Sequence, residues 1–180
     1  MRPTLLYMFL LTLSLAAAVS CNEERELTIA DQEAAIDAYI TQNYSEYPVV
    51  RRNGSNRIDL DTAAVEAMDT LVFGDTLHFY YAGYVFTSAP SALFATNSES
   101  VAEANSFTVT DPDFSVEEVV FTEDCLVNGL VNGLYGVREG GHYIILFSAK
   151  YGFYNSYVYN IPKMSALIYE IWVERVIKKD

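Results

Sequence analysis

The sequence shows no standard motif of a nucleophilic, acid–base or metal site. The two histidines, His78 and His142, each lie in a segment typical of a strand, without a second ligand at metal-binding spacing. Cys125 follows Glu123 and Asp124, whose negative charges disfavour a reactive thiolate. The sequence contains no nucleophile elbow, P-loop or dinucleotide-binding fingerprint. Its 14 tyrosines suit half-buried sheet faces or the walls of an apolar pocket, so recognition by shape is the chemistry to consider.

The composition indicates a globular chain with a strong negative charge. A length of 180 residues favours one domain with an appendage. Because 51% of the residues are hydrophobic and 19% are charged, the chain can build a core. The net charge of −13 argues against nucleic-acid binding, which needs clustered Lys and Arg. We therefore expect no nucleic acid among its ligands. Because the metal-binding and cofactor-binding motifs named above are missing from the sequence, we also expect no metal and no cofactor.

The first twenty residues resemble a bacterial lipoprotein signal. Arg2 supplies a positive start, and the apolar run from Leu5 to Val19 is short for a membrane span. Small residues then stand directly before Cys21. We expect a signal peptide over residues 1–20 and lipidation of Cys21, with an ordinary secretory peptide cut near Ser20 as the alternative.

Lipidation would place the mature chain in the bacterial cell envelope, anchored by lipid at the outer membrane or the periplasmic face. Residues 21–30 would then form a charged tether between the anchor and the folded part. Cys125 would have no disulfide partner, because the chain contains only two cysteines.

A helix is expected from Thr28 to Tyr44. Asp31 suits its N-cap, and Ile36, Tyr39 and Ile40 follow the spacing of one narrow apolar face. A helix with so narrow a stripe must dock on a larger element. We therefore interpret residues 31–73 as an N-terminal helix with a connecting segment, ahead of a main domain over 74–180.

Three segments of the main domain are expected to be its principal strands. Residues 76–86 alternate with large apolar groups on both faces, which indicates a central strand covered on each side. The segments 142–147 and 167–176 show the same β pattern. Shorter strands are expected at 107–110 and, at an edge, at 119–121.

One short helix is expected in this domain, from Leu126 to Val137. Gly129 and Gly133 lie inside it and indicate close approach by another backbone or a ligand. Residues 87–106 are polar and small, which predicts a long loop or a bulged strand. The predicted fold class is therefore α+β, with an antiparallel β-sheet wrapped around one short helix and an N-terminal helical appendage.

The order and spacing of several motifs resemble the FKBP-type peptidyl-prolyl isomerases over roughly residues 74–176. An Asp-Thr-x₄-Tyr-x-Gly pattern stands at 75–83, a Tyr-Gly pair at 151–152, and Ile-Pro-x-x-Ser-x-Leu-x-Tyr-x-Ile at 161–171. Glycines at 129, 133 and 140 stand at the family's intervals. The signal, tether and helix before this region are similar to those of lipoprotein isomerases from Bacteroides-type bacteria.

The resemblance implies a pocket that binds proline-containing protein segments and an isomerase activity on extracytoplasmic proteins. Tyr81 and Tyr151 would be its catalytic residues, with the Tyr151 hydroxyl and the Val127 N–H meeting substrate carbonyls. Two positions depart from the family's pattern, because Leu130 replaces the usual Trp of the pocket floor and Ala95 replaces a usual Asp. The remaining substrate-binding residues would be Phe94, Phe107, Val127, Leu130, Ile161 and Tyr169.

Each of these residues also has a plainer interpretation. Tyr81, Phe107 and Tyr169 would be core residues in any sheet protein, Phe94 could anchor a loop, and Tyr151 could anchor a turn. The two departures favour a second hypothesis, in which a catalytically weak FKBP-like lipoprotein binds a protein partner or scaffolds an envelope complex. A third hypothesis is a surface lipoprotein that binds glycans through exposed aromatic residues.

Overall fold

The computed structural model describes residues 24–61, 69–108 and 113–180. The expected signal peptide, the lipidation site Cys21 and the start of the tether lie outside the described residues. Within the described ranges, no helix combines the length and the apolar character needed to cross a membrane.

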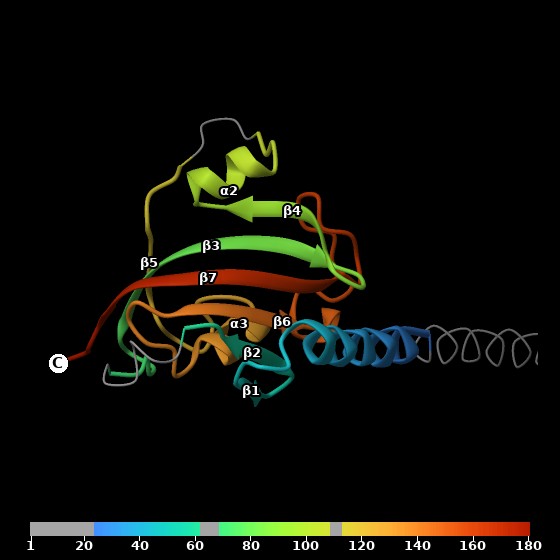
Figure 1. Cartoon of the computed structure of the whole chain (residues 1–180), viewed down its shortest axis with the longest axis horizontal. Helices are drawn as coiled ribbons and strands as arrows, with labels where there is room; N and C mark the ends of the chain where they lie inside the picture. Colours follow the sequence, from blue (N-terminus) through green and yellow to red (C-terminus); the bar gives the residue numbers. More distant parts are fainter. Residues whose placement is uncertain (1–23, 62–68, 109–112) are drawn as a thin grey trace, which may run out of the picture.

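One antiparallel sheet organises the described chain (Figure 1). Its seven strands follow the order β1-β2-β6-β7-β3-β4, and β5 pairs with β3 beside this path. The described helices are the N-terminal helix over residues 24–43, α2 (Glu99–Ala104), α3 (Asn128–Leu134) and a 3₁₀ turn, η1 (Ala149–Tyr151). The strands are β1 (Val49–Arg52), β2 (Ser55–Asp59), β3 (Thr76–Phe86), β4 (Pro90–Thr96), β5 (Glu117–Val120), β6 (His142–Phe147) and β7 (Ala166–Ile177).

The three principal strands confirm the sequence prediction. β3 and β6 have the predicted bounds, and β7 is one residue longer at each end. β3 pairs with β7, β4 and β5, so it is central, as its two apolar faces indicated. The α+β fold class, with a sheet around one short helix and an N-terminal helix, is confirmed.

Each face of the sheet has its own apolar core. On one face α3 packs with Leu130 and Leu134 against Phe79, Ile145 and other residues of β3, β6 and β7. On the other face the N-terminal helix packs against β2, β3, β6 and β7. The residues that are buried there are Ile36, Ile40, Ile58, Phe86, Ile144, Leu146, Ala166 and Ile168.

The two glycines inside α3 allow the helix to lie directly on the sheet. A Cβ atom at Gly129 would overlap the ring of Phe147, and one at Gly133 would overlap Ile145. The close approach predicted from these glycines is present, but the neighbour is the side-chain surface of β6 and not another backbone or a ligand.

Substitution Gly129→Ala is expected to destabilise the protein by about 1–3 kcal/mol, because the added methyl group overpacks the contact between α3 and Phe147. Urea unfolding measures this change. Gly152→Ala is the control, since its Cβ would lie 3.2 Å from Leu167 and 3.4 Å from Phe147. An equal loss in the two variants would contradict this explanation.

The N-terminal helix differs from its prediction at its start. Residue 24 is already helical, so Asp31 lies inside the helix rather than at its N-cap. The predicted apolar stripe is confirmed, because Ile36 and Ile40 are 1% and 4% exposed in the docked interface. In Figure 1 the beginning of this helix points away from the sheet.

Gln32 ties the N-terminal helix to a loop over residues 152–165, called here the cavity loop. Its side-chain carbonyl accepts a hydrogen bond from the Ala149 N–H at 2.9 Å, and its amide nitrogen donates to the Met164 carbonyl at 2.6 Å. Met164 in turn donates from its N–H to the Tyr154 carbonyl at 2.7 Å. One side chain of the helix therefore contacts the chain just before the cavity loop and near its end.

Two segments of the chain are more ordered than predicted. Residues 49–59, assigned to the connecting segment, form the hairpin β1–β2, which joins the sheet through β6. Residues 87–106, predicted as a loop or bulged strand, contain both the bulged strand β4 and helix α2. The strand predicted at 107–110 is not present at 107–108, and its remainder lies outside the described residues.

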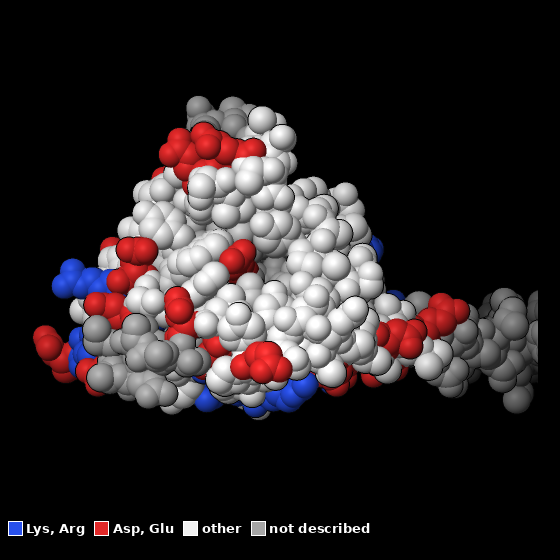
Figure 2. All heavy atoms as spheres, viewed as in Figure 1, with Lys and Arg blue, Asp and Glu red and all other residues white. Residues whose placement is uncertain are grey.

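Charged groups are distributed unevenly over the surface. Figure 2 shows Asp and Glu side chains spread across one face, while Lys and Arg gather toward its edges. This distribution agrees with the net charge of −13. The long-range field of the protein therefore attracts cationic groups.

Asp75 is a buried carboxylate that holds the end of β7 to the turn before β3. It accepts hydrogen bonds from the Lys178 ammonium at 2.6 Å, the Val72 N–H at 2.9 Å and the Lys179 N–H at 3.0 Å. Burial by itself raises the pKa of Asp75, but these hydrogen bonds outweigh it and hold the pKa below its ordinary value.

Substitution Asp75→Asn is expected to cost about 2–3 kcal/mol at neutral pH, the scale of hydrogen bonds to a charged group. Because the folded-state pKa is lowered, the stabilisation by the charged form is present above the unfolded pKa and is lost as the pH falls. Urea unfolding at several pH values should therefore show the wild type and the variant converging below about pH 4. A difference that persists unchanged to pH 2 would contradict the charged role.

Candidate functional site

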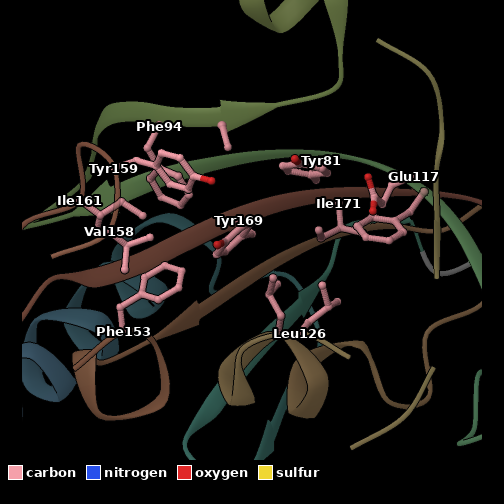
Figure 3. A pocket seen from close by; sticks show the side chains of 13 residues that line it. Tyr81, Phe94, Glu117, Leu126, Phe153, Val158, Tyr159, Ile161, Tyr169 and Ile171 are labelled. Atoms are coloured by element: carbon pink, nitrogen blue, oxygen red, sulfur yellow. The ribbon is translucent and has the colours of Figure 1, made fainter. Parts of the chain in front are cut away.

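An apolar cavity of about 240 Å³ opens between the sheet, α3 and the cavity loop (Figure 3). This volume is below the roughly 300–1,000 Å³ of sites for drug-sized ligands, so it suits one side chain and its adjacent peptide groups. The lining residues are Phe79, Tyr81, Phe94, Ala95, Glu117, Leu126, Leu130, Phe153, Val158, Tyr159, Ile161, Tyr169 and Ile171.

The strand register brings the sheet residues of the cavity together. In the pairing of β3 with β7, Tyr81 stands opposite Ile171 and Gly83 stands opposite Tyr169. Phe79 is two residues before Tyr81, so both side chains lie on the same face. This face is the one that α3 covers, and the helix therefore closes the cavity from the other side.

Gly83 leaves the space that two aromatic walls occupy. The rings of Phe94 and Tyr169 meet edge to face, with centroids 5.6 Å apart and planes at 82°. A Cβ atom at Gly83 would lie 2.7 Å from Phe94 and 2.9 Å from Tyr169, closer than packed carbon atoms come. The ring of Tyr169 also stacks on the ring of Phe147, with centroids 5.9 Å apart, and this contact holds the Tyr169 ring in place. The glycine is therefore a requirement of the wall geometry.

Two phenol hydroxyls, those of Tyr81 and Tyr169, lie in the cavity, and the carboxylate of the exposed residue Glu117 lies at its edge. Burial, with the neighbouring Tyr81, raises the pKa of Tyr169. Burial also raises the pKa of Tyr81, and Glu117 adds to that effect. Both phenols therefore stay protonated at neutral pH and can donate hydrogen bonds. Within the described part of the chain, neither hydroxyl has a hydrogen-bond partner, so a ligand carbonyl could accept from either.

The cavity loop supplies the remaining wall. Phe153, Val158 and Ile161 carry apolar side chains to the cavity, and an antiparallel bridge between Val158 and Ile161 closes the tip of the loop. Tyr159, at that tip, has a positive φ of 49° and is 94% exposed. This tyrosine therefore stands at the rim, where it can contact a bound segment without filling the cavity.

Five of the eight predicted pocket residues line this cavity. Phe107 and Val127 do not, although Val127 lies between two residues that do, Leu126 and Leu130. The Val127 N–H makes no hydrogen bond within the described ranges, so the fold itself does not use it. The five predicted residues that line the cavity are Tyr81, Phe94, Leu130, Ile161 and Tyr169.

Tyr151 is not part of the cavity, contrary to its predicted catalytic place. Its ring packs over Gly54 in the turn of the β1–β2 hairpin, so closely that a Cβ atom there would overlap it. The Lys150 ammonium lies 5.6 Å from the same ring. The structure thus favours the plainer interpretation of this residue, a tyrosine that anchors a turn.

The sequence prediction missed several lining residues, although the spacing of some of them along strands or a helix indicated their position. Phe79 and Ile171 are each two residues from a predicted strand residue, and Leu126 is one helical turn before Leu130. Face periodicity would have added these three. Phe153, Val158 and Tyr159 belong to an irregular loop, in which spacing does not reveal direction.

The site has no arrangement for metal-assisted chemistry in the described ranges. No group of three or more His, Cys, Asp or Glu side chains there could hold a metal ion. His142 bonds to Glu170 at 2.8 Å and stacks on Trp172, and none of these three residues lines the cavity. The arrangement at the cavity can therefore bind an apolar group and donate hydrogen bonds to it.

The structure is similar to solved structures of FkpA, of FKBP domains and of a peptidyl-prolyl cis–trans isomerase. FkpA from Escherichia coli aligns with a TM-score of 0.58 and 16% identity, over 96% of this chain and 71% of its own. An isomerase from Pseudomonas syringae pv. tomato aligns with a TM-score of 0.61 and 11% identity, over 85% and 96%. The three FKBP domains of wheat FKBP73 align with a TM-score of 0.56 and 13% identity, over 74% and 50%.

No protein-family model and no curated protein matches the sequence. At identities of 11–16%, the structural likeness establishes the fold. The chain has the FKBP-like α+β fold, as the resemblance in its motifs implied.

Proposed function

We propose that this protein is a peptidyl-prolyl cis–trans isomerase whose active site is the apolar cavity between β3, β7, α3 and the cavity loop. The observation that carries the proposal is this cavity on an FKBP-like fold, with aromatic walls and two phenol hydroxyls free of internal partners. Its residues suit the prolyl ring, which is apolar and compact. The reaction needs no nucleophile, and the cavity offers none.

The mechanism follows from the electronic structure of the amide. Rotation of an X–Pro bond has a barrier of roughly 18–20 kcal/mol, because the resonance of the planar amide is lost. The twisted amide has less charge separation than the planar one, so a water-poor cavity lowers its free energy relative to both planar forms. Phe94, Tyr169 and Leu130 would hold the prolyl ring, and the Tyr81 hydroxyl would bond a carbonyl of the twisted form.

Three features favour a second candidate, a binding module with weak catalysis. The floor residue Leu130 and the wall residue Ala95 both line the cavity and lack the flat ring and the carboxylate usual in the family. Tyr151, the expected second hydroxyl, lies outside the cavity. Such a protein would bind proline-containing partner segments or scaffold an envelope complex with little acceleration of isomerisation.

A protease-coupled assay on a Leu-Pro peptide separates the two candidates. Acceleration by the wild type that falls in Tyr81→Phe, and not in the off-cavity control Tyr151→Phe, is the result expected for the isomerase. The double variant Leu130→Trp/Ala95→Asp should raise the rate further if the cavity is otherwise competent. If neither the folded wild type nor the double variant accelerates isomerisation, the binding module is the candidate that remains.

The activity is expected to be independent of pH between about 6 and 9. Burial raises the pKa values of Tyr81 and Tyr169 above the already high value for tyrosine, so neither of these two phenols titrates in this range. Measurement of kcat/KM across this range by exchange spectroscopy avoids any effect of pH on a helper protease. A bell-shaped profile would contradict catalysis by binding alone.

The envelope location is part of the same proposal. Cys21 would carry the lipid, and the segment expected as a tether, which is helical from residue 24, would space the cavity from the membrane. Labelling of cells with a radioactive fatty acid should mark the wild-type protein and leave Cys21→Ala unmarked. Equal labelling of both proteins, or of neither, would exclude the lipid anchor at this position.

A further inference from the structure

We propose that Glu117 makes the cavity selective for prolyl segments that carry a Lys or Arg directly beside the proline. This inference rests on the proposed function and adds the class of substrate. It comes from the position of the carboxylate at one end of an otherwise apolar cavity, and from the lack of any basic residue among the lining residues.

The strand register directs Glu117 toward the cavity. On β5 it stands opposite Phe79 of β3, so both side chains lie on the face that α3 covers. The next residue, Glu118, stands opposite His78 and points to the other face, where its carboxylate lies 3.8 Å from the imidazole. Two adjacent glutamates of one strand are thus divided between the cavity and the opposite side of the sheet.

Glu117 lies at the end of the cavity away from the cavity loop. In Figure 3 its carboxylate is near Tyr81 and Ile171, while Phe153 and Tyr159 lie at the opposite end. A prolyl ring held between the aromatic walls would therefore have a neighbouring residue of its own chain near Glu117. An extended chain advances about 3.3–3.6 Å per residue, so the closest such neighbour is the residue directly before or directly after the proline.

Glu117 is exposed to solvent, so water and not a protein group solvates its charge in the free protein. In the described part of the chain, no hydrogen bond or ion pair engages its carboxylate, and no Lys, Arg or His lines the cavity. Its field reaches into the cavity, as its effect on the pKa of Tyr81 shows. A cationic residue of the substrate would supply the missing partner, and an acidic residue would be repelled.

The net charge of −13 acts in the same direction at longer range. A negative protein attracts cationic segments and repels acidic ones, and salt screens this effect within about 8–10 Å. The contribution of Glu117 can therefore be separated from that of the whole surface by changing this one residue, while the other charges remain.

Peptides that differ only in the residue before or after proline test the inference on the purified full-length protein. Lys, Leu and Glu are compared at each position, both by the rate of isomerisation and by the dissociation constant from NMR titration. At one of the two positions, we expect Lys in place of Leu to raise the isomerisation rate and the affinity about two- to fivefold, the scale of an accessible ion pair. Glu in place of Leu should lower both by a similar factor.

Two matched variants decide the origin of any preference. Glu117→Gln should remove most of the Lys-over-Glu ratio, whereas Glu118→Gln should keep the ratio of the wild type. An unchanged ratio in Glu117→Gln, or an equal fall in both variants, would overturn the inference and assign the preference to the overall charge.

The two readouts keep this test distinct from that of the proposed function. If the Leu peptide is isomerised and the ratio is insensitive to Glu117, the isomerase stands and the selectivity fails. If no peptide is isomerised but the dissociation constants follow the predicted order, the selectivity stands on a binding module. Absence of both turnover and binding would overturn both proposals.

Discussion

Substitution Gly83→Val is expected to lower kcat/KM for prolyl isomerisation by roughly 30- to 100-fold, equivalent to about 2–3 kcal/mol of transition-state binding. A branched side chain at this position must displace the rings of Phe94 and Tyr169, because even a single Cβ atom would lie within 3 Å of both. These rings form two walls of the cavity, so their displacement removes the space for the prolyl ring. The rate of cis–trans exchange of a Leu-Pro peptide measures the effect.

A general loss of stability must be separated from this local effect. Gly133→Ala is the matched control, because it also crowds the core on the α3 face, against Ile145 and Ser55, which do not line the cavity. Circular dichroism and urea unfolding establish that both variants are folded in the assay. Equal losses of activity in the two variants would show that Gly83 matters for stability and not for the shape of the cavity.

Substitution Ile36→Asp is expected to have the largest effect on stability, with a loss of about 4 kcal/mol or more. Ile36 is 1% exposed between the N-terminal helix and the sheet, and it packs in one cluster with Ile144 and Ile168. A carboxylate there loses the apolar burial and lacks a partner. Urea unfolding measures the loss, and Ala38→Asp, on the exposed side of the same helix, is the control.

The same substitution should also lower the activity. Gln32 stands one turn before Ile36, and its hydrogen bonds to Ala149 and Met164 depend on a docked helix. Undocking would release both contacts and loosen the cavity loop that carries Phe153 and Ile161. A variant that is less stable but keeps full activity under folded conditions would show that the helix supports the domain without positioning this loop.

The regular parts of the fold were readable from the sequence because their periods are strong. The segment 76–86 alternates over eleven residues with apolar groups on both faces, which left only a central strand as an interpretation. Gly129 and Gly133 predicted a close contact, since glycine inside a helix is unfavourable without one. The strands β3, β6 and β7, the helix α3 and the two covered faces follow from such local patterns.

The weaker parts of the fold depended on contacts that the sequence does not display. β4 is bulged in its pairing with β3, and helix α2 has only six residues, so neither produces a regular period. The hairpin β1–β2 has mixed burial and joins the sheet by pairing with β6, a strand more than eighty residues later. These elements are fixed by tertiary pairing rather than by local preference.

The candidate site divides in the same way. Tyr81, Tyr169 and Leu130 lie on regular elements, where the face of a residue follows from its number, and all three line the cavity. Tyr151 lies at the end of the 3₁₀ turn η1, and its direction depends on the glycine turn of a distant hairpin. A family pattern could suggest its place in the chain but not the direction of its side chain.

The measurement that tests the central claim most directly is exchange spectroscopy of a Leu-Pro peptide with the isotopically labelled protein. One sample reports the cis–trans exchange rate of the peptide and the protein signals that the peptide shifts. We predict accelerated exchange, with the shifts concentrated at Gly83, Ala95, Leu130 and Ile171 around the cavity. Unaccelerated exchange with shifts elsewhere, such as around Ile144 on the opposite face, would contradict the account.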